Sequence, residues 1–252
     1  MKSPVFALPW LAPGENFPDP TRAWDLSDPV PGLLAGGGVL DTPTLKRAYS
    51  SAIFPWFSDD QPVLWWSPDP RMVLKTADFR LHRSLRKTIS RFMLDDRCEV
   101  RFDSNFAKVI RACATGARPG QAGTWIVASM VRAYEEFHRA GYAHSIETWI
   151  DGELAGGLYC VAIGKAVFGE SMFTRSPDAS KIALAALVSF CRYNGISTID
   201  CQQNTRHLAS LGAHEIARAH FVEQVSLDVQ RPGPEWKFKP VYWNELVKPT
   251  PA

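Results

Sequence analysis

Hydrophobic residues recur at helical spacing in the stretch TWIVASMVRAYEEFHRAG, residues 124–141. Ile126, Met130 and Phe137 fall on one side of such a helix, and charged residues occupy the other side. Gly141 supplies a suitable C-terminal cap. The pattern therefore predicts an amphipathic helix with one face against a core.

The next segment, SIETWIDGELAGGLYCVAIGKAVFGESMF, has three runs of strand-forming residues separated by Asp-Gly and Gly-Lys turns. This arrangement predicts three strands that form an antiparallel meander. A run that is apolar on almost every side follows and predicts a buried helix. The elements expected after the meander are this helix over 176–195 with Ser176 as N-cap, a strand over 197–203, a short helix over 205–213 and a strand over 220–227.

The strand STIDCQQ, residues 197–203, combines apolar and polar side chains in alternation. Successive side chains on a strand point to opposite faces, so Ile199 and Cys201 share one face and Asp200 and Gln202 share the other. A carboxylate beside a carboxamide is compatible with a solvated sheet face or with a functional site. The pattern alone leaves both interpretations open.

The first 70 residues are rich in Pro, Gly and Trp, which favours loops, turns and short strands. A helix is expected over 42–52, with Thr42 as N-cap and Pro43 at its first position. Strands are expected over 62–66 and 71–74, joined by the turn-forming SPDP. Residues 114–124, ATGARPGQAGT, are the best candidate for a linker, and one long loop inside a domain is the alternative.

The order of helix, antiparallel strands, helix, strand, helix and strand is that of GNAT-type acyltransferases. We therefore expect an α+β protein with a GNAT-like domain, whose mixed and largely antiparallel sheet carries flanking helices, over residues 106–252. A smaller N-terminal α/β domain is expected over residues 1–105. Because one fold hosts many functions, this order indicates acyl transfer to an amine only as a class of reaction.

The composition indicates the compartment and whether a disulfide framework, a metal site or a membrane span is expected. The chain has 252 residues, 46% of them hydrophobic, and a formal net charge of only +2. Its five cysteines form no C-x-x-C pair and its histidines show no metal-ligand spacing, so neither a disulfide framework nor a metal site is indicated. No signal peptide and no run of about 18 apolar residues is found. We expect a soluble cytoplasmic protein that needs no metal.

Because the net charge is small, contact with a polyanion would require a local basic patch. Arg80, Arg83, Lys87 and Arg91 recur at steps of three and four, so on a helix they would line one stripe. Asp78 is the single acid in this segment, and it does not neutralise the stripe. The stripe is either a solvated helix face or a contact surface for phosphates.

Several segments resemble one family, the leucyl/phenylalanyl-tRNA–protein transferases. The resemblance extends from Gly32 to Ile216, and the segments follow the order of that family. The longest of them are unusual in composition, which makes chance similarity improbable. The matching segments are GLLAGGG, AIFPWFSDDQPVLWWSPDPR, GTWI, AYEEFHRAGYAHSIETW, GGLYCVAIG, FGESMF, ASKIAL, IDCQ and HLASLGAHEI.

The resemblance implies transfer of Leu or Phe, with Met as a further candidate donor, from aminoacyl-tRNA to the α-amino group of proteins that begin with Arg or Lys. The product would carry a degradation signal of the N-end rule. No cofactor is required, because the tRNA ester is already activated. Asp200 and Gln202 would be the catalytic pair, with Asp200 holding the Gln202 side-chain amide. Glu170 would recognise the cationic N-terminal residue of the acceptor.

The resemblance also implies binding sites for the donor. The aminoacyl side chain would enter an apolar pocket of Leu158, Met172, Leu184 and Ile199. The terminal adenosine would contact Trp56, Trp125, Tyr49 and Tyr134. The tRNA phosphates would contact Arg80, Arg83, Lys87 and Arg91.

The chain departs from the family pattern at Val39, where an acid is usual, and at Ser51-Ala52, where Arg-Gly is usual. Two alternatives stay open. An acyl-CoA-dependent N-acetyltransferase would need a glycine-rich pyrophosphate loop, which the nearest segment, FTRSPDAS, does not offer. In the second alternative, a non-enzymatic RNA-binding module, Asp200 and Gln202 would have no catalytic role. A monomer is the expected oligomeric state.

Overall fold

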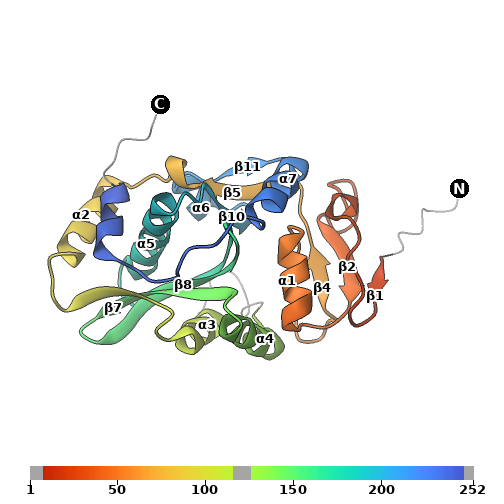
Figure 1. Ribbon diagram of the computed structural model, residues 1–252, viewed down its shortest axis with the longest axis horizontal. Coiled ribbons are helices and arrows are strands. Elements are labelled where there is room, and N and C mark those ends of the chain that lie inside the picture. Colours follow the sequence, from red (N-terminus) through yellow and green to blue (C-terminus); the bar gives the residue numbers. More distant parts are fainter. Residues whose placement is uncertain (1–7, 116–125, 247–252) are drawn as a thin grey trace, which may run out of the picture.

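The computed structural model describes residues 8–115 and 126–246. The described strands form two sheets (Figure 1). The first has four strands in the order β1-β2-β4-β3, and the second has seven in the order β11-β5-β10-β9-β8-β7-β6. The chain is therefore an α+β protein. The strands of the first sheet are β1 (Trp10–Leu11), β2 (Leu33–Gly37), β3 (Phe54–Pro55) and β4 (Leu64–Trp66).

Helix α1 (Thr42–Ser50) connects β2 to β3, and Figure 1 shows it on the side of the small sheet that faces the rest of the molecule. Its N-cap is Asp41, whose side chain accepts a hydrogen bond of 2.8 Å from the Thr44 amide. The predicted cap, Thr42, is instead the first helical residue. Asp41, one position earlier, is the N-cap because its carboxylate reaches the free amides of the first turn.

The seven-stranded sheet contains the predicted meander of β7, β8 and β9, which is confirmed. Its centre is the pair β9 and β10, the single parallel pair among the described strands of this sheet. A buried helix crosses over between these two strands, as the sequence predicts. The strands are β5 (Arg71–Lys75), β6 (Cys98–Phe102), β7 (Ala143–Ile150), β8 (Glu153–Ile163), β9 (Ala166–Thr174), β10 (Thr198–Gln202) and β11 (His214–Ile216).

Helices cover both faces of this sheet (Figure 1). On one face, α3 (Phe106–Thr115) and α4 (Ala128–Arg139) pack into a core that continues into the small sheet. On the other face, α5 (Ala179–Tyr193) packs with α2 (Arg83–Phe92) and the C-terminal 3-10 segment. The remaining helices are α6 (Arg206–Ser210), α7 (Arg218–Asp228) and the 3-10 turns η1 (Pro20–Arg22), η2 (Thr76–Asp78) and η3 (Pro240–Leu246).

The SPDP segment carries the chain from one sheet to the other and does not form a hairpin, because β4 and β5 belong to different sheets. The change of sheet comes between Trp66 and Arg71. Both β5 and β6 lie in the large sheet, so the expected domain boundary at residue 105 does not coincide with this change. The region rich in Pro, Gly and Trp, the first 70 residues, instead contains all four strands of the small sheet.

Two further predictions are wrong. Residues 220–227 belong to helix α7, in which Phe221 and Val225 are buried four positions apart, so helical spacing outweighs their strand propensity. Helix α5 begins after Asp178, which adopts a left-handed φ of 62°, and not after Ser176. The predicted linker from residue 116 onward, with Trp125, lies outside the described residues. Every helix within the described ranges is too short or too polar to cross a bilayer.

Candidate active site

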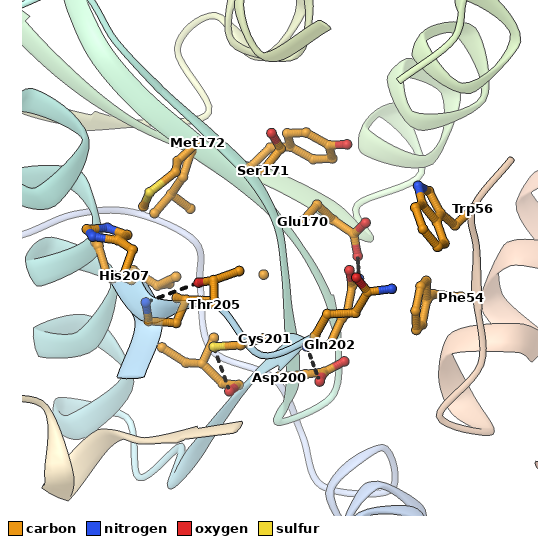
Figure 2. A pocket seen from close by; sticks show the side chains of 18 residues that line it. Phe54, Trp56, Glu170, Ser171, Met172, Asp200, Cys201, Gln202, Thr205 and His207 are labelled. Atoms are coloured by element: carbon orange, nitrogen blue, oxygen red, sulfur yellow. Dashed lines mark hydrogen bonds between the residues drawn. The ribbon is translucent and has the colours of Figure 1, made fainter. Parts of the chain in front are cut away.

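A cavity of about 370 Å³ lies between strands β8, β9 and β10, helices α5 and α6, and strand β3 of the small sheet. In Figure 2, Met172 and His207 stand at one side of the cavity, Phe54 and Trp56 at the other, and Glu170 and Gln202 between them. The lining residues are Phe54, Trp56, Leu158, Tyr159, Gly169, Glu170, Ser171, Met172, Leu184, Leu187, Ile199, Asp200, Cys201, Gln202, Gln203, Thr205, His207 and Leu208.

One half of the cavity is apolar. The structure places all four residues expected in the aminoacyl pocket in its wall, and it adds Leu187 from α5. They converge because β8, β9 and β10 are neighbours in the sheet and α5 packs across them. The four expected residues are Leu158, Met172, Leu184 and Ile199.

Aromatic side chains form the opposite wall. Phe54 and Trp56 come from β3 and the residue that follows it, so the small sheet completes the cavity. The Trp56 ring packs against Trp66 at a centroid distance of 5.1 Å, and the Trp66 indole N–H donates to the Trp56 carbonyl at 2.6 Å. These contacts hold the half-buried Trp56 ring at the cavity wall.

The two central strands are both irregular at the cavity. In β9, Tyr159 of β8 faces Ser171 and Cys160 faces Gly169, so Glu170 is an extra residue of a β-bulge. In β10, Asp200 faces Val73 and Gln202 faces Met72, so Cys201 is the extra residue. Bulges re-aim the side chains around them. Strict alternation of faces, on which the sequence-based expectation rested, ends at these points.

Glu170 and Gln202 are joined by a hydrogen bond, in which Gln202 Nε2 donates to Glu170 Oε1 at 3.0 Å. The same oxygen accepts from the Tyr49 hydroxyl at 2.7 Å, and Tyr49 also bonds to the Tyr134 hydroxyl. Glu170 Oε2 is buried and has no hydrogen-bond partner among the described residues. Burial raises the pKa of Glu170 to about 7, and the nearby charge of Asp200 adds to this rise.

Asp200 does not contact the Gln202 side-chain amide, contrary to expectation. Its Oδ1 accepts from the Gln202 backbone N–H at 2.9 Å and from Arg71 Nε at 2.8 Å. Its Oδ2 accepts from Arg71 Nη2 at 2.6 Å. The Asp200 and Arg71 side chains are each only 1% exposed. The sequence-based site missed Arg71, whose signal was its position at the end of the SPDPR segment.

Tyr49 and Tyr134 do not line the cavity. Both side chains are fully buried, and burial raises the pKa of each hydroxyl well above its usual range. They reach the cavity only through the carboxylate of Glu170. In this structure the hydroxyl of Tyr49, itself bonded to that of Tyr134, supports Glu170, and contacts of these tyrosines with an adenosine stay a prediction.

Arg80, Arg83, Lys87 and Arg91 are all exposed, on α2 or just before it. Among the described residues none of the four is in an ion pair with an acid. The Arg80 amide donates to Leu211 at the end of α6. The four cations, here named the basic stripe, are thus connected through Arg80 to the end of α6, whose residues His207 and Leu208 line the cavity.

No three His, Cys, Asp or Glu side chains come together as a metal-binding group in the described ranges. The polar groups at the centre of the cavity are the Glu170 carboxylate, the Gln202 carboxamide and, through Asp200, a buried ion pair, and Ser171, Cys201, Thr205 and His207 also line it. The carboxylate and the carboxamide can orient an amine and a carbonyl compound. Burial raises the pKa of the Cys201 thiol, which disfavours the nucleophilic thiolate.

Comparison with known proteins agrees with this chemistry. Residues 73–226 match the family model described as leucyl/phenylalanyl-tRNA protein transferase, and residues 38–69 match that of its N-terminal domain. Proteins named leucyl/phenylalanyl-tRNA–protein transferase from a Polaromonas species and from Albidiferax ferrireducens are 63% and 59% identical to the chain. The alignments cover 96% of both chains in the first case, and 99% of this chain and 98% of the relative in the second.

A solved structure of a functionally unknown conserved protein from Staphylococcus epidermidis reaches a TM-score of only 0.34, at 9% identity over 59% of this chain and 57% of that chain, and it carries no argument about the fold. The N-terminal family model ends at residue 69, between β4 and β5, and the other begins at residue 73 within β5, so the two divide the chain near the change of sheet. The identities and the coverage together establish that this chain belongs to the leucyl/phenylalanyl-tRNA protein transferase family.

Proposed function

We propose that this protein transfers leucine or phenylalanine from aminoacyl-tRNA to the α-amino group of proteins that begin with Arg or Lys, and so creates a degradation signal. One observation carries the proposal: a single cavity joins an apolar half to a polar edge made by Glu170 and Gln202. The apolar half suits the donor side chain, and the acidic edge suits a cationic acceptor.

The donor side chain would enter the half lined by Leu158, Met172, Leu184 and Ile199. A cavity of about 370 Å³ falls within the usual range for small-ligand sites, about 300–1,000 Å³. Met172 is half-buried, and an unbranched thioether adapts to both an aliphatic and an aromatic guest. Polar side chains would be rejected, because they would be buried there without partners.

The terminal adenosine would stack on Trp56, with Phe54 beside it. Each base stacked on an aromatic side chain contributes about 1–3 kcal/mol to binding in single-strand recognition. Trp125 stays a predicted contact, since it lies outside the described residues. The basic stripe would bind acceptor-stem phosphates, because it is exposed and its first member, Arg80, is hydrogen-bonded to the end of α6, a helix that lines the cavity.

In the reaction, the acceptor α-amine attacks the carbonyl carbon of the tRNA ester. A C–N bond forms, the C–O bond to the ribose breaks, and the proton lost by the amine ends on the released ribose hydroxyl. An α-amine has a pKa of about 8, so modest help suffices to keep it unprotonated. Holding amine and ester in register could supply several kcal/mol, within the roughly 7–11 kcal/mol that effective molarities allow.

Gln202 would provide part of this register. Its Nε2 is committed to Glu170, while Oε1 accepts no hydrogen bond from the described residues. Oε1 would accept a hydrogen bond from the attacking amine and hold its lone pair toward the ester. Gln202 thus acts as the group that contacts the nucleophile.

Glu170 would bind the Arg or Lys side chain of the acceptor. Its buried Oε2 lacks a partner in the free protein, and a guanidinium or ammonium group would supply a charge-assisted hydrogen bond. Satisfying a buried acceptor recovers about 1–3 kcal/mol of its desolvation cost. A cation would also favour the ionised carboxylate, whose formation burial opposes.

We further propose that the large sheet is a GNAT-like domain and that the chain acts as a monomer. The parallel pair β9 and β10, joined by α5 beside an antiparallel meander, supports the first point. The N-terminus of α5 argues against acyl-CoA as donor. Ala179 is fully buried there, and a side chain at Gly156 of β8 would lie 2.6 Å from its Cβ, which leaves no open cradle for a pyrophosphate.

A transfer assay tests the proposal directly. Leu-tRNA and Phe-tRNA labelled in the amino acid are incubated with peptides that begin with Arg, Lys, Asp or Ala, and acetyl-CoA serves as the competing donor. Label should appear on the Arg and Lys peptides alone, and acetylation should be absent. Acetylation without aminoacyl transfer would establish the N-acetyltransferase alternative, and tRNA binding with neither activity would establish the RNA-binding module.

A further inference from the structure

Arg71 is a fully buried arginine one strand away from Gln202. Its guanidinium makes the two parallel hydrogen bonds to Asp200, and Nη1 donates to the Ala52 carbonyl at 3.3 Å. The charged group lies between two aromatic rings, 4.8 Å from the Phe54 centroid and 4.6 Å from that of Phe221. These contacts fix the position of the guanidinium group.

Arg71 does not line the cavity, so it does not contact a substrate. Its influence on the site must pass through its neighbours. Phe54 forms part of the aromatic wall, and Asp200 lies at the polar edge. Arg71 therefore connects the small sheet to β10 at the point where the cavity crosses between them.

Asp200 links the fixed guanidinium of Arg71 to the backbone of Gln202. Both of its oxygens are engaged by Arg71, and Oδ1 also accepts from the Gln202 backbone N–H. Gln202 has a φ of 61°, in the left-handed region that a non-glycine residue rarely adopts unless its surroundings hold it there. The hydrogen bond from Gln202 to Asp200 is such a restraint, and it brings the Gln202 side chain to Glu170.

We propose that Arg71 is a positioning residue for aminoacyl transfer: through its paired hydrogen bonds to Asp200, it holds Gln202 in the left-handed conformation that presents its carboxamide to the acceptor amine. The proposal rests on the proposed function. It gives Asp200 the task of orientation, since its buried carboxylate already accepts two hydrogen bonds from Arg71 and one from the Gln202 backbone.

A double-mutant cycle separates positioning from a structural role. Arg71→Lys keeps the charge but loses the paired geometry, and Gln202→Ala removes the group on which Arg71 acts. Arg71→Lys should lower kcat about 100-fold, the loss typical of a small misplacement of reacting groups. The tRNA Kd should change less than about twofold. In the Gln202→Ala background the same change should lower kcat less than about threefold, because coupled residues are not additive.

Two further variants secure the interpretation. Arg71→Met combined with Asp200→Leu replaces the ion pair by apolar groups, an exchange that often preserves folding. This variant should melt cooperatively and transfer as slowly as Gln202→Ala. Arg218→Lys is the matched control, since Arg218 is also buried but donates to the carbonyls of Ser67 and Thr21. It should lower the melting temperature and leave kcat within about twofold.

The outcomes distinguish the two proposals. If wild-type protein transfers no amino acid, the proposed function fails. If wild-type protein is active, three results overturn the role of Arg71: unchanged kcat in Arg71→Lys, an equal loss in the presence and absence of Gln202, or wild-type transfer by the folded Arg71→Met/Asp200→Leu variant.

Discussion

Gln202 and Glu170 form a hydrogen bond of 3.0 Å across two neighbouring strands, at the place where each strand carries a β-bulge. Glu170 is the extra residue of β9, and Gln202 directly follows the extra residue of β10, Cys201. The two irregularities act together, since a bulge turns side chains away from their regular faces. The polar edge of the cavity is thus a product of backbone geometry as much as of side-chain chemistry.

Replacing Gln202 by Ala should slow the chemical step and spare binding. The carboxamide oxygen is expected to contact the attacking amine, so kcat should fall about 100-fold, within the range of 10²–10⁴ for a positioned proton-accepting group. Single-turnover transfer from pre-bound Leu-tRNA to an Arg-starting peptide measures this rate. Gln203→Ala is the matched control, because Gln203 is exposed at the mouth of the same cavity. Equal loss in both variants would contradict the assignment.

The sequence was sufficient to predict the meander and the buried helix α5, because these features follow from periodicity and from the order of elements. The convergence of four apolar residues on one cavity was expected only from the family resemblance. The bulges at Glu170 and Cys201 were not predictable in this way, because one extra residue leaves no mark on composition or on the strand-forming character of a run. The contact of Asp200 with the Gln202 backbone, and not with its side chain, depends on that geometry.

Acceptor binding should weaken as the pH falls through about 7. Burial raises the pKa of Glu170 to about 7, so the carboxylate is charged above that pH and neutral below it. The KM for an Arg-starting peptide should therefore rise between pH 8 and pH 6, and Glu170→Gln should show a high KM with a weaker dependence on pH. Protonation of the peptide amine affects both proteins equally. The difference between their KM profiles is the measurement, and parallel profiles would contradict the role of Glu170.

Glu170 should also leave a signature in stability. The pKa of about 7 in the folded state exceeds the ordinary value of 4.5, so the folded protein binds more protons between these limits than the unfolded chain does. By linkage, the contribution of Glu170 to the free energy of unfolding falls as pH rises from about 4.5 to 7. Denaturant titrations of wild type and Glu170→Gln at pH 5 and pH 8 measure it. Their stability difference should shift in favour of Glu170→Gln at the higher pH, and a constant difference would argue against an elevated pKa.

Leu184→Phe should change the choice of donor. Leu184 is 5% exposed and faces the cavity from α5, so a larger side chain would fill part of the space that a phenylalanyl group needs. Transfer of Phe should fall relative to Leu by about 10-fold or more in kcat/KM, the scale of discrimination by pocket shape. Competition between the two charged tRNAs provides the ratio, with a thermal melt to confirm folding. An equal decrease for both donors would place Leu184 outside the donor pocket.

The basic stripe should determine how tRNA binding depends on salt. Each of Arg83→Ala and Lys87→Ala should reduce the slope of log K against log salt by about 1, since one phosphate contact contributes about 0.9. Arg139→Ala is the control, because Arg139 is 71% exposed on α4 and lies outside the stripe. Filter-binding titrations at several salt concentrations give the slopes. A slope unchanged in the stripe variants, or reduced equally in Arg139→Ala, would assign the stripe to solvated surface.

The position of Arg71 shows a second limit of reasoning from sequence. In the chain it stands near several other arginines and lysines, and its charge alone suggests a surface residue. Its burial follows from tertiary packing between Phe54 and Phe221, which are 167 residues apart in the chain. Helical spacing did identify the exposed cations of α2, because an amphipathic helix shows its buried face in its periodicity.

Because of the paired bulges, the site depends on the number of residues in β9 and β10 as well as on their identity. Removing Cys201 alone would keep every side chain that the reaction is proposed to use, yet it would let β10 pair regularly with β5 and turn Gln202 away from Glu170. Homologous sites of this kind are therefore vulnerable to single-residue deletions in a strand that contains no loop, and an alignment gap there is as informative as the loss of a catalytic side chain.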